Sequence, residues 1–253
     1  MIPYIHATTI ALGPLTIHVW GFFVALAFVV GIVIARRMVR NRGLDSHYVM
    51  NMAGWVIVAT FVGARLFHVF FYDWSYYAAH PSDIIKFWEG GLASFGGYIG
   101  ATTAVLVYLR YHHLSILTWA NPLIYALPLG IAIGRLGPFF GHLHPGIHSN
   151  FFLAIQYPDG SRLDADLLLA MNGAILAIIF WMCNRRIRHD GFFLTLFLFW
   201  YGVTRFLLDF VRATDIPMPD ARYLGLTPAQ YGAIMFIIVG IVLTTRTNSS
   251  IVK

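Results

Sequence analysis

The sequence has little charge and almost no cysteine. Only 11% of its 253 residues are Asp, Glu, Lys or Arg, and Cys183 is the one cysteine. A single cysteine excludes a disulfide within the chain, so cysteine usage indicates nothing about the redox compartment. The scarcity of charge excludes an ordinary soluble domain, because a soluble domain of this size keeps many charged side chains on its surface.

Hydrophobic residues take the place of the missing charge. They make up 58% of the chain, and the mean hydropathy is +0.70. We therefore expect a polytopic membrane protein, and since no repeat or linker divides it, one membrane domain over residues 1–253. The net charge of +6 does not indicate nucleic-acid binding, because the arginines lie in short loops between apolar segments.

Long apolar segments recur along the whole chain. A membrane-spanning helix needs about 20 apolar residues to cross a hydrocarbon core of about 30 Å. Seven segments meet this length, at residues 16–37, 47–72, 92–112, 115–136, 165–183, 192–212 and 228–245. The pattern predicts an all-α fold of seven transmembrane helices.

The basic residues between these segments predict the orientation of the chain. The first, third and fifth loops and the tail carry Arg36, Arg37, Arg40, Arg42, Arg110, Arg185, Arg186, Arg188, Arg246 and Lys253. The alternate loops carry only Lys86, Arg162 and Arg222. Because positive residues stay on the cytoplasmic side, we expect the N-terminus outside and the C-terminus in the cytoplasm.

The loops expected outside are the longer ones. Residues 73–91 are amphipathic and rich in aromatic side chains, which is typical of a segment at the membrane interface. Residues 138–164 contain Pro158-Asp159-Gly160 between short apolar runs, which predicts a short hairpin.

Four arginines lie in or at the ends of the apolar segments: Arg65, Arg135, Arg205 and Arg212. An arginine at the centre of a membrane helix costs about 2.5–3.5 kcal/mol on insertion scales, so a shared anionic partner is expected. Helical spacing places four residues on one face, Tyr201, Arg205, Asp209 and Arg212. We expect a cationic pocket near the outer leaflet that binds a lipid phosphate through the planar guanidinium groups. Snorkelling arginines and an internal Arg–Asp lock are the alternative.

Glycines and histidines give two further signals. The glycines Gly90, Gly91, Gly96 and Gly97 open the third segment, where they allow close approach of a helix or of a ligand. One outer loop holds His142, His144 and His148, and Asp164 and Asp166 follow it. Such residues could bind zinc or carry protons. We expect no bound metal and no cofactor.

Several motifs, taken in order, resemble one known family. GGLASFGGYIG at 90–100, IGRLGPFF at 133–140 and YGVTRFLLDFVR at 201–212 are similar to three signature regions of bacterial prolipoprotein diacylglyceryl transferases. The segments GPLTIHVWGFF, VGARLFHVFFY and YLGLTPAQYGAIM look similar too. The resemblance covers nearly the whole chain.

The resemblance implies a multi-pass protein of the bacterial inner membrane. Its partners would be membrane lipids, phosphatidylglycerol as the donor, and a lipoprotein precursor whose lipobox cysteine accepts the diacylglyceryl group. Arg135 and Arg205 match two essential arginines of the family, and Tyr201, Asp209 and Arg212 match their neighbours. We expect a monomer.

The chain departs from the family pattern at its proton-handling positions. The histidine of the glycine-rich motif is replaced by Phe95, and other differences fall at Trp20, Pro138, Leu143 and residues 162–170. We infer that His142 or His144, oriented by Asp164 or Asp166, replaces the lost base. Two alternatives remain: a lipid-headgroup-binding paralogue that is non-catalytic or altered in specificity, and a metal-dependent membrane hydrolase built on His142, His144 and His148.

Overall fold

The computed structural model describes the chain except for residues 13–14, 88–89, 186–188, 218 and 252–253. The basic residues Arg186, Arg188 and Lys253, used above to predict orientation, therefore lie outside the described residues. Contacts divide the chain into two compact units. The larger unit comprises Met1–Met38 and Ala120–Lys253, and the smaller unit is Val39–Trp119.

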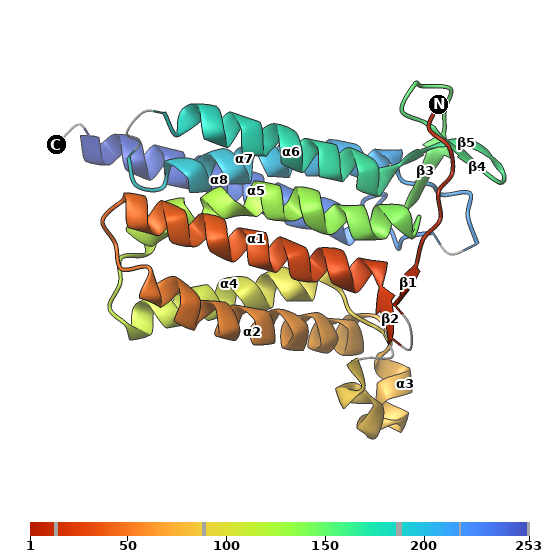
Figure 1. Cartoon of the computed structure of the whole chain (residues 1–253), viewed down its shortest axis with the longest axis horizontal. Helices are drawn as coiled ribbons and strands as arrows, with labels where there is room; N and C mark the ends of the chain where they lie inside the picture. The colour runs from red at the N-terminus through yellow and green to blue at the C-terminus, as the bar shows by residue number, and fades with distance from the viewer. Residues whose placement is uncertain (13–14, 88–89, 186–188, 218, 252–253) are drawn as a thin grey trace. The chain divides into compact units, whose positions relative to one another are not determined.

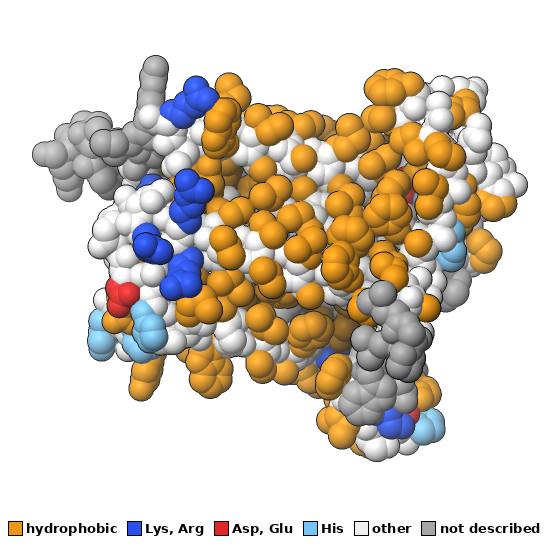
Figure 2. Space-filling view, viewed as in Figure 1, with side chains coloured by type: hydrophobic (Ala, Val, Ile, Leu, Met, Phe, Trp, Pro, Cys, Tyr) orange, Lys and Arg blue, Asp and Glu red, His pale blue; other side chains and the backbone are white. Residues whose placement is uncertain are grey.

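Six helices are long and apolar enough to cross a membrane, counted over the part of the chain that the structure describes. They are α1 (Val19–Asn41), α2 (His47–Phe71), α5 (Ile116–Phe140), α6 (Ala165–Cys183), α7 (Phe192–Leu208, whose span continues to Val211) and α8 (Pro228–Ile251). Six of the predicted spans are therefore confirmed as helices of spanning length, and the chain is a mostly helical, multi-pass membrane protein. Hydrophobic side chains cover the flanks of the helices on the visible face, and blue side chains gather near helix ends (Figure 2).

The seventh predicted segment, 92–112, forms α4 (Ser94–Tyr111). Its 18 residues have spanning length, but it is not among the six candidate spans. Its glycines and threonines lower its hydropathy, so a seventh span stays a prediction.

In the larger unit, α1, α5, α6, α7 and α8 run alongside one another, with a small sheet at one end (Figure 1). The buried core between α6 and α7 consists of Leu176, Phe180, Phe193, Phe197 and Tyr201. Small residues bring the helices into close contact. A Cβ added at Gly173 of α6 would lie 2.8 Å from the Pro128 carbonyl oxygen of α5, which is the helix packing expected in membranes.

The small sheet is built from the predicted outer loop. Its strands are β3 (Pro145–His148), β4 (Ile155–Tyr157) and β5 (Gly160–Asp164), antiparallel in the order β3-β5-β4. The hairpin predicted at Pro158-Asp159-Gly160 is confirmed, with Tyr157 opposite Gly160. Other segments cover both outer edges of the sheet, since Ile2 bridges to Ile155 and Gly146 bridges to Arg212.

A second hairpin, β1 (Thr9–Leu12) with β2 (Leu15–His18), was not predicted from the sequence. Residues 16–18, expected to begin the first helix, belong to β2, and the helix begins at Val19. The alternation of Thr16, Ile17 and His18 fits a strand, and an apolar count alone does not distinguish it from a helix. The all-α prediction therefore holds for the membrane part but omits these two small sheets.

In the smaller unit, α2 packs against α4 through glycines. A Cβ added at Gly63 would lie 3.1 Å from the Gly100 Cα and would also meet the Gly96 carbonyl oxygen. Gly96 therefore serves the close approach of the two helices. An apolar groove of about 1060 Å³ runs along the pair from Trp55 to His112. The segment between the helices contains α3 (Trp74–Ala79) and a 3-10 helix, η1 (Pro81–Ile85).

Candidate active site

The junction between β5 and α6 contains two aspartates, separated in the chain by Ala165. Asp164 is the N-cap of α6, and its side chain accepts hydrogen bonds of 2.9 Å from the Asp166 and Leu167 backbone N–H groups. Aspartate is a preferred N-cap because it satisfies N–H groups that the helix leaves unpaired. The cap therefore fixes Asp166 in the first turn of α6.

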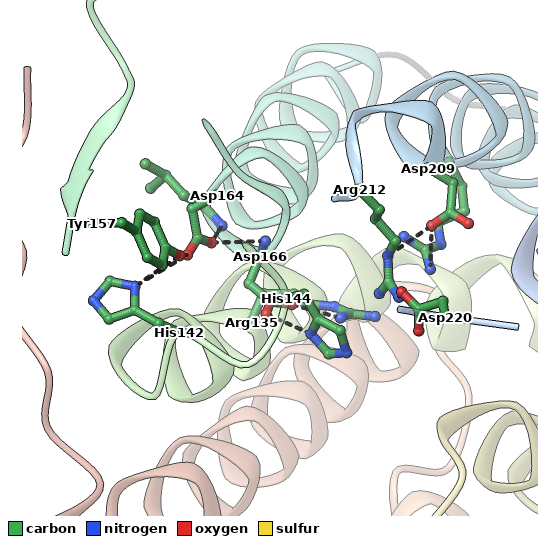
Figure 3. A network of polar contacts seen from close by, with 11 residues as sticks. Arg135, His142, His144, Tyr157, Asp164, Asp166, Asp209, Arg212 and Asp220 are labelled. Atoms are coloured by element: carbon green, nitrogen blue, oxygen red, sulfur yellow. Dashed lines mark hydrogen bonds and ion pairs between the residues drawn. The ribbon is translucent and has the colours of Figure 1, made fainter. Parts of the chain in front are cut away.

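Asp166 holds an arginine and a histidine with one carboxylate (Figure 3). Its Oδ1 accepts a 2.8 Å hydrogen bond from Arg135 Nη1, and its Oδ2 lies 2.7 Å from His144 Nδ1. The Asp166 side chain is fully buried, whereas that of His144 is 30% exposed. Because an ionised carboxylate only accepts hydrogen bonds, Nδ1 carries the imidazole proton here and Nε2 is left with its lone pair.

His142 has quite different surroundings. Its Nδ1 lies 3.1 Å from the Tyr157 hydroxyl and 3.2 Å from Asp164 Oδ2, and its Nε2 lies 3.1 Å from the Ile5 carbonyl oxygen. Tyr4 stacks on the ring with centroids 4.2 Å apart. The His142 side chain is only 3% exposed, so both ring nitrogens are engaged and covered.

Asp164 and Tyr157 share a buried hydrogen bond. The Tyr157 hydroxyl donates to Asp164 Oδ2 over 2.6 Å. Burial raises the pKa of the Asp164 carboxyl, because the charged form loses hydration. Burial also raises the pKa of Tyr157, as does the nearby Asp164 charge. The His142 and Asp164 side chains are thus shielded from solvent, with Tyr157 half-buried beside them.

His148 contacts a third carboxylate, with Nε2 3.4 Å from Asp215 Oδ2. The three histidines of the loop are thus directed to three different aspartates. Among the described residues, no group of three His, Cys, Asp or Glu side chains is arranged to hold a metal ion. The metal-dependent alternative has no ligand set in this part of the chain.

A second set of charges lies where α7 ends. Asp209 is fully buried, and its Oδ1 lies 3.0 Å from Arg205 Nη2 and 3.0 Å from Arg212 Nε. The predicted segment 192–212 agrees with the candidate span Phe192–Val211, but the α-helix itself ends at Leu208 and a 3-10 turn, η3 (Asp209–Val211), follows. Arg212 therefore lies past the helix in an extended conformation, but Asp209 still reaches both arginines. Tyr201, one turn before Arg205, is buried and stacks on Phe197.

The start of α8 supports Asp209. Thr227 donates a hydrogen bond from its hydroxyl to Asp209. Its backbone N–H donates to Gln230 Oε1 at 2.9 Å, and its hydroxyl accepts from the Gln230 N–H at 3.2 Å. This is a reciprocal capping box. Sequence reasoning missed these two residues and Asp220, which pairs with Arg212. The Thr-x-x-Gln pattern before an apolar run could have identified the first two.

One arginine nitrogen in this set lacks a partner. Arg205 Nη1 is buried and has no hydrogen-bond acceptor among the described residues, whereas Arg212 Nε lies 3.0 Å from Asp209 Oδ1. An unsatisfied buried charged donor is costly, and a phosphate oxygen is the acceptor that matches a guanidinium best. The arrangement is therefore suited to an anionic ligand.

Strand β3 connects the two sets of charges. The Ala165 N–H donates to the His144 carbonyl oxygen at 3.2 Å on one side of the strand. On its other side, the Ala213 N–H donates to the Pro145 carbonyl oxygen at 3.0 Å, and Gly146 bridges to Arg212. His144 is thus two residues from the point where the chain meets the Arg212 segment.

Arg65, in the smaller unit, is surrounded by carbonyl groups. Its Nε, Nη1 and Nη2 donate to the carbonyl oxygens of Ile84, Gly90, Gly91, Asp83 and Lys86, at distances from 2.5 to 3.2 Å. A guanidinium has five N–H groups, so these acceptors occupy all of them. The predicted phosphate contact at Arg65 does not fit this arrangement, because no donor is left for it.

The glycine-rich motif has structural uses in the same unit. Gly90 and Gly91 have φ values of +95° and +70°, which favour glycine. A Cβ at Gly91 would lie 2.7 Å from Arg65 Nη1. A glycine here therefore allows the five carbonyl groups to surround Arg65, and we call these groups the carbonyl cage. Gly97 lies against Thr60, and Phe95 packs on Phe67 with ring centroids 5.5 Å apart.

Taken with the fold, these sets of charges define a multi-pass membrane protein with buried arginines beside an oriented histidine. The family model described as prolipoprotein diacylglyceryl transferase matches residues 7–246. The chain belongs to this family, as the motifs indicated.

Known proteins named phosphatidylglycerol–prolipoprotein diacylglyceryl transferase are similar over nearly the full length. The one from Symbiobacterium thermophilum is 31% identical, over 96% of this chain and 93% of its own. That from Neisseria meningitidis serogroup B is 29% identical, over 95% of each chain. That from Chromohalobacter salexigens is 29% identical, over 95% of this chain and 92% of its own.

Proposed function

We propose that this protein transfers a diacylglyceryl group from phosphatidylglycerol to the cysteine thiol of a lipoprotein precursor. Family membership supports the reaction. One observation supports the assignment of the phosphate-binding residues. The buried Arg205 Nη1 has no acceptor among the described residues, and Arg205 shares Asp209 with Arg212.

The arginines bind and stabilise the phosphate. Arg205 and Arg212 offer donors to the phosphodiester of the lipid, and Arg135, fixed by Asp166, adds positive charge on the His144 side. When the carbon–oxygen bond to the phosphate breaks, its electron pair stays on the leaving glycerol phosphate. Arg205 and Arg135, fixed in advance, stabilise that developing charge without reorganisation. Arg212 binds the phosphate equally before and during the reaction.

His144 is the base in this proposal. Its Nε2 removes the proton of the cysteine thiol, and the thiolate sulfur attacks the glycerol carbon that carries the phosphate, forming a thioether. Asp166 holds the ring and stabilises the imidazolium that forms. His142 does not fit this role, because both of its nitrogens have partners and its side chain is 3% exposed.

We also propose that the chain lies in the bacterial inner membrane as a single domain and a monomer, with α4 as a seventh span. The N-terminus is outside and the C-terminus is cytoplasmic. The ends of α1 and α4 support this orientation, because Arg40 and Arg110 lie in their last turns. The sheet and both sets of charges then lie at the outer surface, where a lipoprotein cysteine arrives.

The test is transfer of labelled diacylglyceryl from phosphatidylglycerol to a lipobox peptide by the purified protein in vesicles. Arg205→Lys keeps the charge but loses the planar fork. We expect the transfer rate to fall by a factor on the order of 10²–10³, as for loss of a preorganised donor.

Arg222→Lys is the matched control, since Arg222 lies outside both sets of charges, and it should transfer like the parent. Equal rates for Arg205→Lys and the parent would exclude the phosphate role. A parent protein that binds phosphatidylglycerol without transferring it would instead be a lipid-headgroup-binding paralogue.

A further inference from the structure

Arg162 on β5 is a buried arginine that the proposed mechanism does not use. Its side chain is 3% exposed. Two parallel hydrogen bonds, of 2.9 and 2.8 Å, join it to the two carboxylate oxygens of Asp215. It also donates to Asp159 at 2.8 Å and to the Gly146 carbonyl oxygen at 3.1 Å. A two-point arginine–carboxylate pair fixes orientation as well as distance.

Asp215 and Gly146 are both linked to Arg212, one along the chain and the other by a backbone bridge. Asp215 is three residues after Arg212 in the chain. Gly146 forms the backbone bridge to Arg212 itself. Arg162 therefore connects the sheet to the segment 212–215 at two points, one through a side chain and one through the backbone.

The contact between β3 and this segment leaves no room for displacement. A Cβ at Gly146 would lie 2.7 Å from the Leu163 carbonyl oxygen and 2.8 Å from that of Val211. The strand is thus held in backbone contact on both sides. Arg212 lies past the end of α7, so this contact holds its backbone while Asp209 and Asp220 pair with its side chain.

We infer that Arg162 is a positioning residue for the phosphate of the substrate lipid, acting through Asp215 and Gly146 on the segment that carries Arg212. The inference rests on the proposed function. Without the Arg162–Asp215 pair, the backbone at 212–215 gains freedom and the Arg212 guanidinium is no longer fixed against the phosphate. Loss of a contact that is made equally before and during the reaction raises KM and leaves kcat unchanged.

The Arg162–Asp215 pair stays charged at the pH of the test. Asp215 faces Arg162 and, at 3.4 Å, His148. The hydrogen bond from Arg162 lowers the pKa of Asp215 to about 2, so the Arg162–Asp215 pair stays charged throughout the neutral range. The charge of the pair itself is therefore constant across that range, and the variants can be compared at one neutral pH.

Two asparagine variants separate positioning from simple stabilisation of the sheet. Asp215→Asn and Asp159→Asn each remove one carboxylate partner of Arg162, but only Asp215 belongs to the segment with Arg212. We expect Asp215→Asn to raise the KM for phosphatidylglycerol about tenfold with little change in kcat, as for loss of uniform binding. Asp159→Asn should keep the parental KM. Equal KM values for the two variants, or a parental KM in Asp215→Asn, would overturn the inference.

A double-mutant cycle adds a readout that loss of stability does not reproduce. If Asp215 acts through Arg212, then Asp215→Asn should raise KM no further in an Arg212→Gln background, since the two changes are coupled. Additive effects would overturn the inference. If the parent transfers nothing, the proposed function fails, and the equilibrium affinity for phosphatidylglycerol in vesicles replaces KM in the same comparison.

Discussion

Two histidine–aspartate pairs, built from the same residue types, lie two positions apart in this chain. His142 pairs with Asp164, and His144 pairs with Asp166. Both carboxylates are fully buried, but the His142 side chain is 3% exposed and that of His144 is 30% exposed. The aspartates are therefore alike in burial, and the difference lies in the histidines.

What separates the pairs is the partner of the second ring nitrogen. For His142 it is the Ile5 carbonyl oxygen, with Tyr4 stacked on the ring, so the N-terminal segment closes the pair. His144 shares its aspartate with Arg135 instead. One pair is suited to holding the sheet together, and the other to moving a proton beside positive charge.

The largest expected effect comes from Asp166→Asn compared with Asp164→Asn. The Asp166→Asn variant loses the charge that holds both Arg135 and His144, so transfer should fall by a factor on the order of 10²–10⁴, the range of acid–base contributions. The Asp164→Asn variant keeps a cap on α6, because asparagine is as good an N-cap as aspartate, and transfer should stay near parental. Equal losses in the peptide transfer assay would contradict the proposal that only the His144–Asp166 pair takes part in transfer.

A somewhat smaller effect is expected from His144→Gln, about 10²-fold within the range for a lost base. His142→Gln is the matched control, because both of its ring nitrogens have partners, and it should transfer close to the parent. Transfer rates in the peptide assay test this, and a parental rate in His144→Gln would exclude it as the base.

Tyr157→Phe should affect stability rather than transfer. It removes the 2.6 Å hydrogen bond to the buried Asp164, and a buried acceptor that loses its partner costs about 1–3 kcal/mol. Thermal unfolding in detergent should show the loss, while transfer per folded molecule stays parental. Tyr76→Phe is a matched control, since its hydrogen bond to Asp83 lies near the surface, and it should unfold close to the parent. Lost transfer at full stability would place Tyr157 in the reaction.

The smallest expected effect concerns pH and stability. Burial raises the pKa of Asp164 above its ordinary value of 3.8, so the folded state binds this proton more tightly than the unfolded state does. The resulting stabilisation is complete below pH 3.8 and is lost as pH rises through the raised folded value. Asp164→Asn should therefore show a flatter dependence of unfolding temperature on pH above 3.8. An unchanged slope would mean that Asp164 does not contribute to it.

The sequence was sufficient to predict most of the helices, because an apolar run of spanning length has few other uses. It was also sufficient to pair Asp209 with Arg205, since a spacing of four residues lies on one helix face. Arg212 departed from that face because α7 ends at Leu208, and helix ends are set by local capping and tertiary contacts that periodicity does not show.

Which of His142 and His144 serves as the base could not be predicted from the sequence. It depends on contacts from Ile5 and Tyr4, which are far away along the chain. Likewise, nothing near Arg65 in sequence indicates that its acceptors come from residues 83–91. Backbone carbonyl groups are present at every residue, so a cage made of them leaves no compositional signal.

That cage has a consequence for the biogenesis of the protein. All the carbonyl acceptors of Arg65 lie between Asp83 and Gly91, so they leave the ribosome after α2 does. Until they arrive, α2 carries an arginine without its acceptors, which is unfavourable inside a bilayer. The helix thus depends on the following segment to complete its insertion, and a chain truncated before residue 83 and released from the ribosome should integrate α2 less efficiently than one truncated after residue 91.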